Sequence, residues 1–387
     1  MTDSDAPGSG AATPRSVAIP TSADLARARA ALAGVLRPTP LLESPGLGDR
    51  VFLKVETALP TASFKPRGTL PALGALGPGT TAIVASAGNA ALGMAWAARH
   101  LARPLIVVVP ETASGAKLAK LRRQPITMLR AGRSFDEAEA AALRLAAKGR
   151  GRYVSSYNDT HLIAGYATLG HELADIPPPA TVVCPVGGGG LISGLCMWAR
   201  AHPHVRIVGA EAAASRAMST AINAGRIVDV DINPTLADGL AGNIERGSVT
   251  VEISRARVDA MVAVTEDEIA AAIRYLATEH GLIAEGAGAV ATAAVLAGRV
   301  PSKGPVVAIL SGANISPPLL ATVITGETGL AALSKRCRVP GAGSASGRPD
   351  RAQVTAGRGS SPTSQPWLRI GVRSALGSPV PRSRWPR

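Results

Sequence analysis

The chain has few aromatic residues, no long apolar run and no apolar segment at its start. Aromatic residues make up 3% of the 387 positions, which leaves few flat side chains on which nucleic-acid bases could stack. No apolar run approaches the roughly 20 residues that a membrane-spanning helix needs. The first 20 residues begin acidic and lack the apolar core of a secretory signal. We therefore expect a cytoplasmic protein without a membrane partner.

Cysteine is also scarce, and its pattern argues against a protein held together by disulfides. The three cysteines, Cys184, Cys196 and Cys337, show no CxxC pairing. Their odd number and the missing secretory signal both disfavour a disulfide framework. Cys184 and Cys196 lie in apolar surroundings, so we expect them to be buried in the core.

The formal net charge of +14 is concentrated at one end of the chain. From residue 327 onward, eleven basic and two acidic residues contribute +9 of that total. Residues 331–387 are rich in Pro, Gly, Ser and Arg and show no helical or strand period, so we expect a basic, disordered tail. Residues 1–20 have a similar small-residue composition and are also expected to be disordered. We expect no nucleic-acid partner, and an RNA-binding tail is the weaker alternative.

Short apolar runs rich in Val and Ile alternate with helical segments from about residue 51 to residue 310. Residues 81–86 and 104–110 are two such runs, and each is continuous rather than alternating. Continuous runs are typical of parallel strands that helices cover on both faces, so the pattern predicts an α/β fold. A helix is expected before them, with Ser22 or Asp24 near its cap. Ligands of such folds bind where strands end and helices begin.

Two segments place unusual residues near such positions. Lys65 in PTASFKPRG stands between Phe64 and Pro66, which is a poor setting for a solvated lysine, although a surface lysine at a helix start is an alternative. SAGNAALG (86–93) follows a predicted strand, and the free amides of a helix start there would suit a carboxylate or phosphate. Asn89 adds a side-chain amide at that place. The alternative for this segment is an ordinary turn.

Four consecutive glycines in PVGGGGLISG form the most informative loop. A plain turn needs one or two glycines, whereas four allow several amides to wrap one anion. The loop matches neither the Walker A motif nor the Rossmann fingerprint. A phosphate cradle together with a reactive lysine indicates pyridoxal 5'-phosphate as cofactor. Ser311 in SGAN, at the end of the last predicted strand, could bond the pyridine nitrogen, or it could be a turn residue.

These segments resemble the serine/threonine dehydratase branch of the tryptophan synthase β-like, fold type II pyridoxal-phosphate enzymes. The chain has PTASFKPRG, SAGNAALG, PVGGGGLISG, TLADGLA and SGAN in the order expected of that branch, and RPTPLLES and EGAGA are similar in kind. The resemblance covers about residues 25–325. It implies two domains, each with a parallel sheet between helix layers, within a catalytic region of residues 21–330. The smaller domain is expected at about 55–155, and the enzyme is expected to be a homodimer.

The resemblance also assigns roles. Lys65 is similar to the lysine that forms the Schiff base and removes the α-proton, and Ser311 to the partner of the pyridine nitrogen. Asn89 is similar to the residue that bonds the phenolic oxygen of the cofactor. The expected phosphate cup consists of Gly187, Gly188, Gly189, Gly190 and Leu191. The loop expected to bind the substrate carboxylate consists of Ser86, Ala87, Gly88 and Asn89.

The implied reaction is the β-elimination of threonine, serine or a related 3-hydroxy amino acid, which gives a 2-oxo acid and ammonia. The alternatives are a threonine synthase-like or β-replacement enzyme, a racemase side activity, and a non-catalytic relative that binds an amino acid. The presence of Lys65 disfavours the last, because a non-catalytic protein has no need to keep it.

The chain also departs from the family pattern. Ala90 and Leu92 stand where the branch has His and Gln near the substrate, which puts the usual substrate in question. Glu285 matches an acidic residue of the family. Glu211 matches the first ligand of a divalent cation in some relatives, but Ala217 replaces the second carboxylate, so we predict no tightly bound metal. The other departures replace Gln or Gly, and they are Ala62, Tyr166, Ala167 and Ala313.

Overall fold

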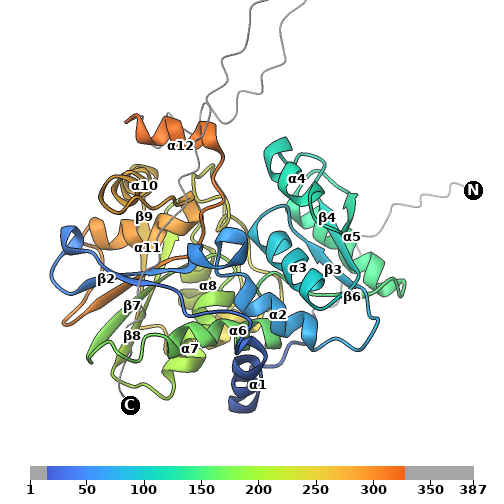
Figure 1. The fold of residues 1–387 in the computed structure, drawn as a ribbon, viewed down its shortest axis with the longest axis horizontal. Coiled ribbons are helices and arrows are strands. Elements are labelled where there is room, and N and C mark those ends of the chain that lie inside the picture. Colours follow the sequence, from blue (N-terminus) through green and yellow to red (C-terminus); the bar gives the residue numbers. More distant parts are fainter. Residues whose placement is uncertain (1–14, 327–387) are drawn as a thin grey trace, which may run out of the picture. The chain divides into compact units, whose positions relative to one another are not determined.

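The computed structural model describes residues 15–326, except for the side chains of residues 116 and 117. The described residues belong to one compact unit, which contains two sheets with helices on both faces (Figure 1). The predicted basic tail at 331–387 and residues 1–14 of the predicted N-terminal segment lie outside the described residues. The domain division at about 55–155 stays a prediction.

The larger sheet has six strands, and five of them are parallel. Its order is β1 (Leu41–Glu43), β2 (Val51–Val55), β10 (Val306–Leu310), β7 (Ala180–Pro185), β8 (Val205–Ala212) and β9 (Ala260–Val264). Only β1 runs antiparallel to its neighbour, and its three residues are exposed or half-buried. The sequence analysis missed β1 because a short edge strand leaves no continuous apolar run.

The smaller sheet has four strands, and all of them are parallel. Its order is β5 (Thr127–Arg130), β4 (Leu105–Val109), β3 (Ala82–Ala85) and β6 (Arg152–Tyr153). Ala82 and Val84 join the core that includes α2 (Pro66–Gly74) and α3 (Asn89–His100). The intervening Ile83 and Ala85 join α5 (Phe135–Ala147) in a separate core on the other face. This alternation makes three layers, as predicted.

The larger sheet is layered in the same way. Val182 and Ile207 pack in one core with α6 (Thr160–His171) and α7 (Gly190–Ala199). Val183 and Val208 pack in another core with α10 (Glu266–His280) and α11 (Gly286–Leu296). Cys184 and Cys196 are buried and free, which confirms their expected place in the core. The predicted α/β fold with parallel sheets between helices is therefore confirmed.

The remaining helices lie around these layers. They are α1 (Ser22–Leu32), α4 (Gly115–Arg122), α8 (Ala217–Ala224), α9 (Val249–Arg257) and α12 (Pro317–Ile324). The cap of α1 was predicted one or more residues too late. Thr21 is its N-cap, and it exchanges hydrogen bonds with Asp24 in a capping box. Within residues 15–326, no helix is long and apolar enough to cross a membrane. The cytoplasmic location and the homodimer stay predictions.

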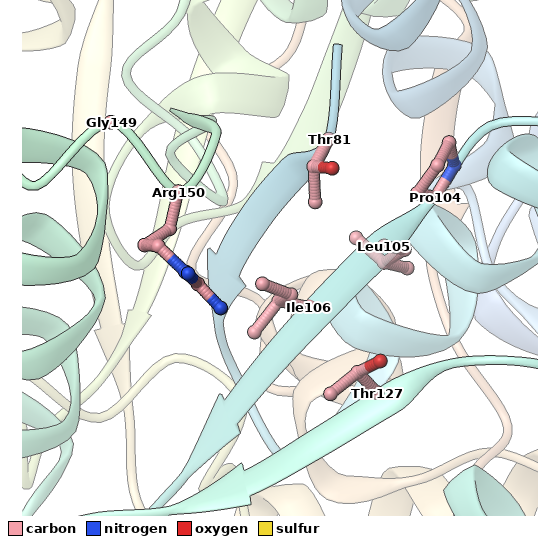
Figure 2. Close-up of a pocket in the computed structure, with 7 residues that line it drawn as sticks. All are labelled: Thr81, Pro104, Leu105, Ile106, Thr127, Gly149 and Arg150. Carbon is pink, nitrogen blue, oxygen red and sulfur yellow. The ribbon is translucent and has the colours of Figure 1, made fainter. Parts of the chain in front are cut away.

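A pocket of about 390 Å³ lies at the amino-terminal ends of the strands in the smaller sheet (Figure 2). Thr81, Leu105 and Thr127 line it at the starts of their strands, and Arg150 closes one side. Ligands of α/β folds bind at the opposite, carboxyl-terminal ends of the strands. Lys65, the turn at 86–89, the glycines at 187–190 and Ser311 instead follow the carboxyl ends of strands, and none of them lines this pocket.

Candidate active site

Lys65 lies where the chain turns from β2 into α2. It is the N-cap of α2, and Pro66 occupies the first helical position, where a missing N–H costs nothing. The preceding residues Thr61 and Ala62 have left-handed backbone angles, with φ of 74° and 52°. This conformation is unfavourable for residues other than glycine, so it has a physical cost at both positions. The loop that presents Lys65 is therefore tightly specified rather than an open surface turn.

The amine of Lys65 is enclosed. Its Nζ donates to the carbonyl oxygen of Ser156 at 3.0 Å and stands over the rings of Phe64 and Tyr166, 4.8 and 5.8 Å from their centroids. Burial lowers the pKa of Lys65 to about 8, and the negative charge of Glu285 opposes part of that shift. The amine is thus partly neutral near neutral pH, as a nucleophile and proton acceptor must be.

Neighbouring glycines bring other elements against Lys65. A Cβ on Gly93 of α3 would lie 2.8 Å from the Cβ of Lys65. A Cβ on Gly68 of α2 would lie 2.5 Å from the ring of Tyr166. Tyr166, which replaces a family Gln, is fully buried, and its ring occupies the space that Gly68 leaves open. Its ring forms one wall around the Lys65 amine.

The four-glycine loop connects β7 to α7. Gly189 is the N-cap of α7 with φ of +88°, which only glycine adopts easily. A Cβ on Gly188 would lie 2.5 Å from the ring of Tyr157, so the loop is also packed too closely for side chains. No hydrogen bond among residues 15–326 is donated by the amides of residues 187–191. Unpaired amides at a helix start are chemically suited to a phosphate, so the loop fits the cofactor.

Ser311 follows β10 and lies beside the Lys65 loop. Its carbonyl accepts from the amide of Phe64 at 3.0 Å, and Ala313 donates to the carbonyl of Ala62 at 2.9 Å. The side chain of Ser311 is 4% exposed, and within residues 15–326 its hydroxyl takes part in no hydrogen bond. A hydroxyl can both donate and accept a hydrogen bond, so Ser311 is chemically suited to pair with the pyridine nitrogen of the cofactor.

The segment Ser86–Asn89 links β3 to α3 and reaches across to α11. The hydroxyl of Ser86 accepts from the amide of Gly88 at 3.1 Å, which shapes the turn. The side-chain amide of Asn89 donates to Glu285, and its oxygen accepts from Asn314 at 2.7 Å. The turn and the start of α3 present amides in the manner that suits a carboxylate.

The two family substitutions on α3 lie in different settings. Ala90 is 6% exposed and buried, whereas Leu92 is half-buried and packs against the core. Neither side chain can donate or accept a hydrogen bond, so any polar contact that a His or Gln makes here in relatives is absent from this chain.

The structure thus brings the predicted residues together at the carboxyl ends of β2, β3, β7 and β10. It also adds residues that the sequence analysis missed. Ser156 and Tyr157 connect Lys65 to the glycine loop, Thr250 donates to the carbonyl of Gly188 at 2.8 Å, and Asn314 accepts from Lys120 of α4 at 2.7 Å. Asn314 is the last residue of the SGAN motif, but the sequence analysis gave it no role. The other three lie in segments without any motif.

Glu211 has a structural task in this chain. Its carboxylate accepts from the amides of Met218, at 2.8 Å, and Ser219, at 3.3 Å, at the start of α8. Burial raises the pKa of this carboxyl, and the hydrogen bonds from Ser219 and Met218 oppose the shift. Within the described part of the chain, no group of three or more His, Cys, Asp or Glu side chains could hold a metal ion. The expected absence of a tightly bound metal stays a prediction.

Comparisons with known proteins agree with this geometry. A family described as pyridoxal-phosphate dependent enzymes matches residues 32–312. L-threonine ammonia-lyase of Thermotoga maritima is 39% identical over 314 residues, which cover 79% of this chain and 78% of that protein. The corresponding enzyme of Geobacter sulfurreducens is also 39% identical, over 76% of this chain and 73% of that protein.

Two solved structures share the fold. A threonine deaminase from T.th. aligns with a TM-score of 0.70 and 34% identity, over 77% of this chain and 99% of that one. Maize serine racemase aligns with a TM-score of 0.73 and 25% identity, over 80% of this chain and 98% of that one. The predicted resemblance to the dehydratase branch, and with it the type of fold, is confirmed.

Proposed function

Because the chain belongs to the family of pyridoxal-phosphate-dependent enzymes, we propose that it removes water and ammonia from threonine, serine or a related 3-hydroxy amino acid. Its cofactor is pyridoxal 5'-phosphate, as predicted. The observation that carries the proposal is the placement of the Lys65 amine, which donates to the carbonyl of Ser156 and stands over the rings of Phe64 and Tyr166. The named relatives support the choice of substrate.

The roles that we propose follow from position. Lys65 would hold the cofactor covalently, and the unpaired amides of residues 187–191 would bind its phosphate. Ser311 would meet the pyridine nitrogen, and Asn89 the phenolic oxygen. Ser86, Ala87 and Gly88 would bind the substrate carboxylate beside Asn89. Ala90 and Leu92 offer no side-chain hydrogen bond at this end of α3, so the hydroxyl of the substrate would have to find its partners elsewhere.

Lys65 has a second task in this scheme. When bound, the cofactor supplies the electron sink that acidifies the α-carbon of an amino acid. Nζ of Lys65 would then accept the α-proton, because a buried amine with a pKa of about 8 can be neutral at working pH. Ser311 is neutral, so unlike a carboxylate it would not enforce protonation of the ring nitrogen. This favours loss of the β-hydroxyl over transamination.

We expect 2-oxo acid and ammonia from a subset of 3-hydroxy amino acids. The experiment incubates the enzyme with the L and D forms of serine and threonine and with L-alanine, which has no leaving group at the β-carbon. Both products are measured, along with chirality of the remaining amino acid. Equal amounts of both products from L-threonine or L-serine, and none from L-alanine, are the expected result. Racemisation without ammonia release, or product only when a second nucleophile is added, would contradict the proposal in favour of the racemase or β-replacement alternatives.

Attachment of the cofactor is expected to depend on pH through Lys65. Only the neutral amine attacks an aldehyde, and burial lowers the pKa of this amine to about 8. The attachment rate should therefore rise about fivefold from about pH 7 to pH 8 and level off above about pH 9, as the neutral fraction does. Absorbance after mixing cofactor with cofactor-free protein measures it. A rate that still climbs at about pH 10, as for a solvated lysine, would show that the amine is not buried as described.

A further inference from the structure

The segment Ser155–Asn158 contacts both halves of the candidate site, although no motif marks it. The carbonyl of Ser156 accepts from Nζ of Lys65 at 3.0 Å. The ring of Tyr157 fills the space beside Gly188, where a Cβ would come within 2.5 Å of it, and the backbone of Tyr157 borders Gly190. The position of this segment therefore sets where the glycine loop can lie.

Glu245 fastens this segment from the loop between α8 and α9. Its carboxylate accepts from the hydroxyl of Ser155 at 3.0 Å and from the side-chain amide of Asn158. Its own backbone amide donates to the hydroxyl of Tyr157 at 2.7 Å. These three hydrogen bonds hold the segment Ser155–Asn158 in one position and one orientation relative to the glycine loop.

Arg15 completes the arrangement from the start of the described chain. Its guanidinium pairs with Glu245 at 2.7 Å, donates to the carbonyl of Asn158 at 3.0 Å and stands 4.9 Å over the ring of Tyr153. The side chains of Arg15 and Glu245 are 27% and 13% exposed, so the pair is partly desolvated. A partly desolvated, charge-assisted hydrogen bond holds its partners more firmly than an exposed pair.

We propose that Arg15, acting through Glu245 and Tyr157, is a positioning residue for the phosphate group of the cofactor. Arg15 touches neither the glycine loop nor Lys65. Instead, it orients the carboxylate of Glu245, which holds the segment Ser155–Asn158 against the glycine loop and so limits where the amides of residues 187–191 can lie. This inference rests on the proposed role of the glycine loop as the phosphate site.

A purely structural ion pair would have a different signature. Loss of such an ion pair would lower the stability of the protein, and it would weaken the binding of phosphorylated and non-phosphorylated cofactor to the same extent. A positioning role at the phosphate site affects only the form that carries a phosphate. The informative readout is therefore the ratio of release rates of pyridoxal and pyridoxal 5'-phosphate from the loaded enzyme, measured by dialysis together with thermal unfolding.

The experiment compares wild type, Arg15→Ala, Arg15→Lys, Glu245→Gln and the control Arg299→Ala. Arg299, which follows α11, also forms an ion pair, with Glu268 of α10 at 2.6 Å, and neither residue belongs to the site. Arg15→Ala and Glu245→Gln should release the phosphorylated form about tenfold faster, the size of one lost charge-assisted hydrogen bond. Release of pyridoxal should stay within about twofold. Arg15→Lys, which keeps the positive charge, should release the phosphorylated form at a rate close to that of wild type. Arg299→Ala should leave both release rates unchanged.

Two results would overturn the inference alone, and a third would also overturn the proposed phosphate site. Unchanged release from both Arg15→Ala and Glu245→Gln, or equal acceleration for the two forms, means that the pair is only structural. Glu245→Gln keeps the side-chain volume, so it decides the question even if Arg15→Ala folds poorly. If wild type itself holds the phosphorylated form no better than pyridoxal, the glycine loop is not the phosphate site, and both the inference and that part of the proposed function fall.

Discussion

Replacing Lys65 by alanine is expected to lower the rate of 2-oxo acid release by about 1,000-fold or more, because one side chain is assigned both covalent attachment and proton removal. Desolvation lowers the pKa of the Lys65 amine to about 8, so part of it is neutral at working pH. The variant should also lose covalent attachment, so borohydride treatment of the loaded protein should label no peptide. The measurements are product release from L-threonine and L-serine and mass analysis of the reduced, digested protein.

Two companion variants make the result specific to the amine. Lys65→Arg keeps a positive charge at the position, but a guanidinium stays protonated and cannot serve as base, so it should be as inactive as the alanine variant. Lys303→Ala removes an exposed lysine from the loop before β10 and should behave as wild type. Full activity in Lys65→Ala, or a labelled peptide from elsewhere in the chain, would remove the mechanism proposed here.

Much of the fold could be predicted because its strands are buried on both faces. Residues 82–85 illustrate this, since Ala82 and Val84 face one helix layer and Ile83 and Ala85 face the other. Such strands must be apolar throughout, which leaves an unmistakable run in the sequence. The edge strand β1 has no such requirement and was missed. The cap of α1 was misplaced because Thr21, Ser22 and Asp24 are all good capping residues, and only the backbone angles select Thr21.

The candidate site was predictable where a local motif encodes it. The glycines at 187–190 can be recognised in the sequence because a side chain at any of these positions would clash with a neighbouring atom. Tyr157 does not, because its place beside Gly188 depends on how two distant segments pack. The same holds for the contact between Lys65 and Ser156, which are 91 residues apart in the sequence. Such contacts follow from the three-dimensional register of packed layers, which no short pattern records.

A buried charge network next to Lys65 carries the second large prediction. Arg67 binds Glu56 at 2.6 Å and Glu172 at 2.6 Å, and Lys54 binds Glu172 at 2.6 Å. Arg67 and Glu56 are 2% and 0% exposed, and the network joins β2, α2 and the end of α6. Arg67→Met would leave the Glu56 carboxylate buried without its cation, so we expect the free energy of unfolding to fall by about 3–5 kcal/mol. Urea unfolding of variant and wild type measures it.

The same network predicts how the stability of the protein changes at acid pH. Burial by itself would raise the pKa of Glu172, but Arg67 and Lys54 outweigh it and lower the pKa below its ordinary value of 4.5. The stability from this carboxylate is therefore present above about pH 4.5 and is lost as pH falls through the lower folded value. Arg67→Met should weaken that acid dependence.

Charge pairing also predicts how two changes combine. Because the cost of Arg67→Met comes mainly from the stranded carboxylate, adding Glu56→Gln should recover part of the lost stability, rather than add to the loss as independent sites do. The exposed pair of Arg299 and Glu268 provides the comparison, since breaking it leaves no buried charge and should shift the unfolding midpoint little. If Arg67→Met and Arg299→Ala shift that midpoint equally, the network does not stabilise the Lys65 loop. The presence of Arg67 two residues after Lys65 would then need an explanation other than stability.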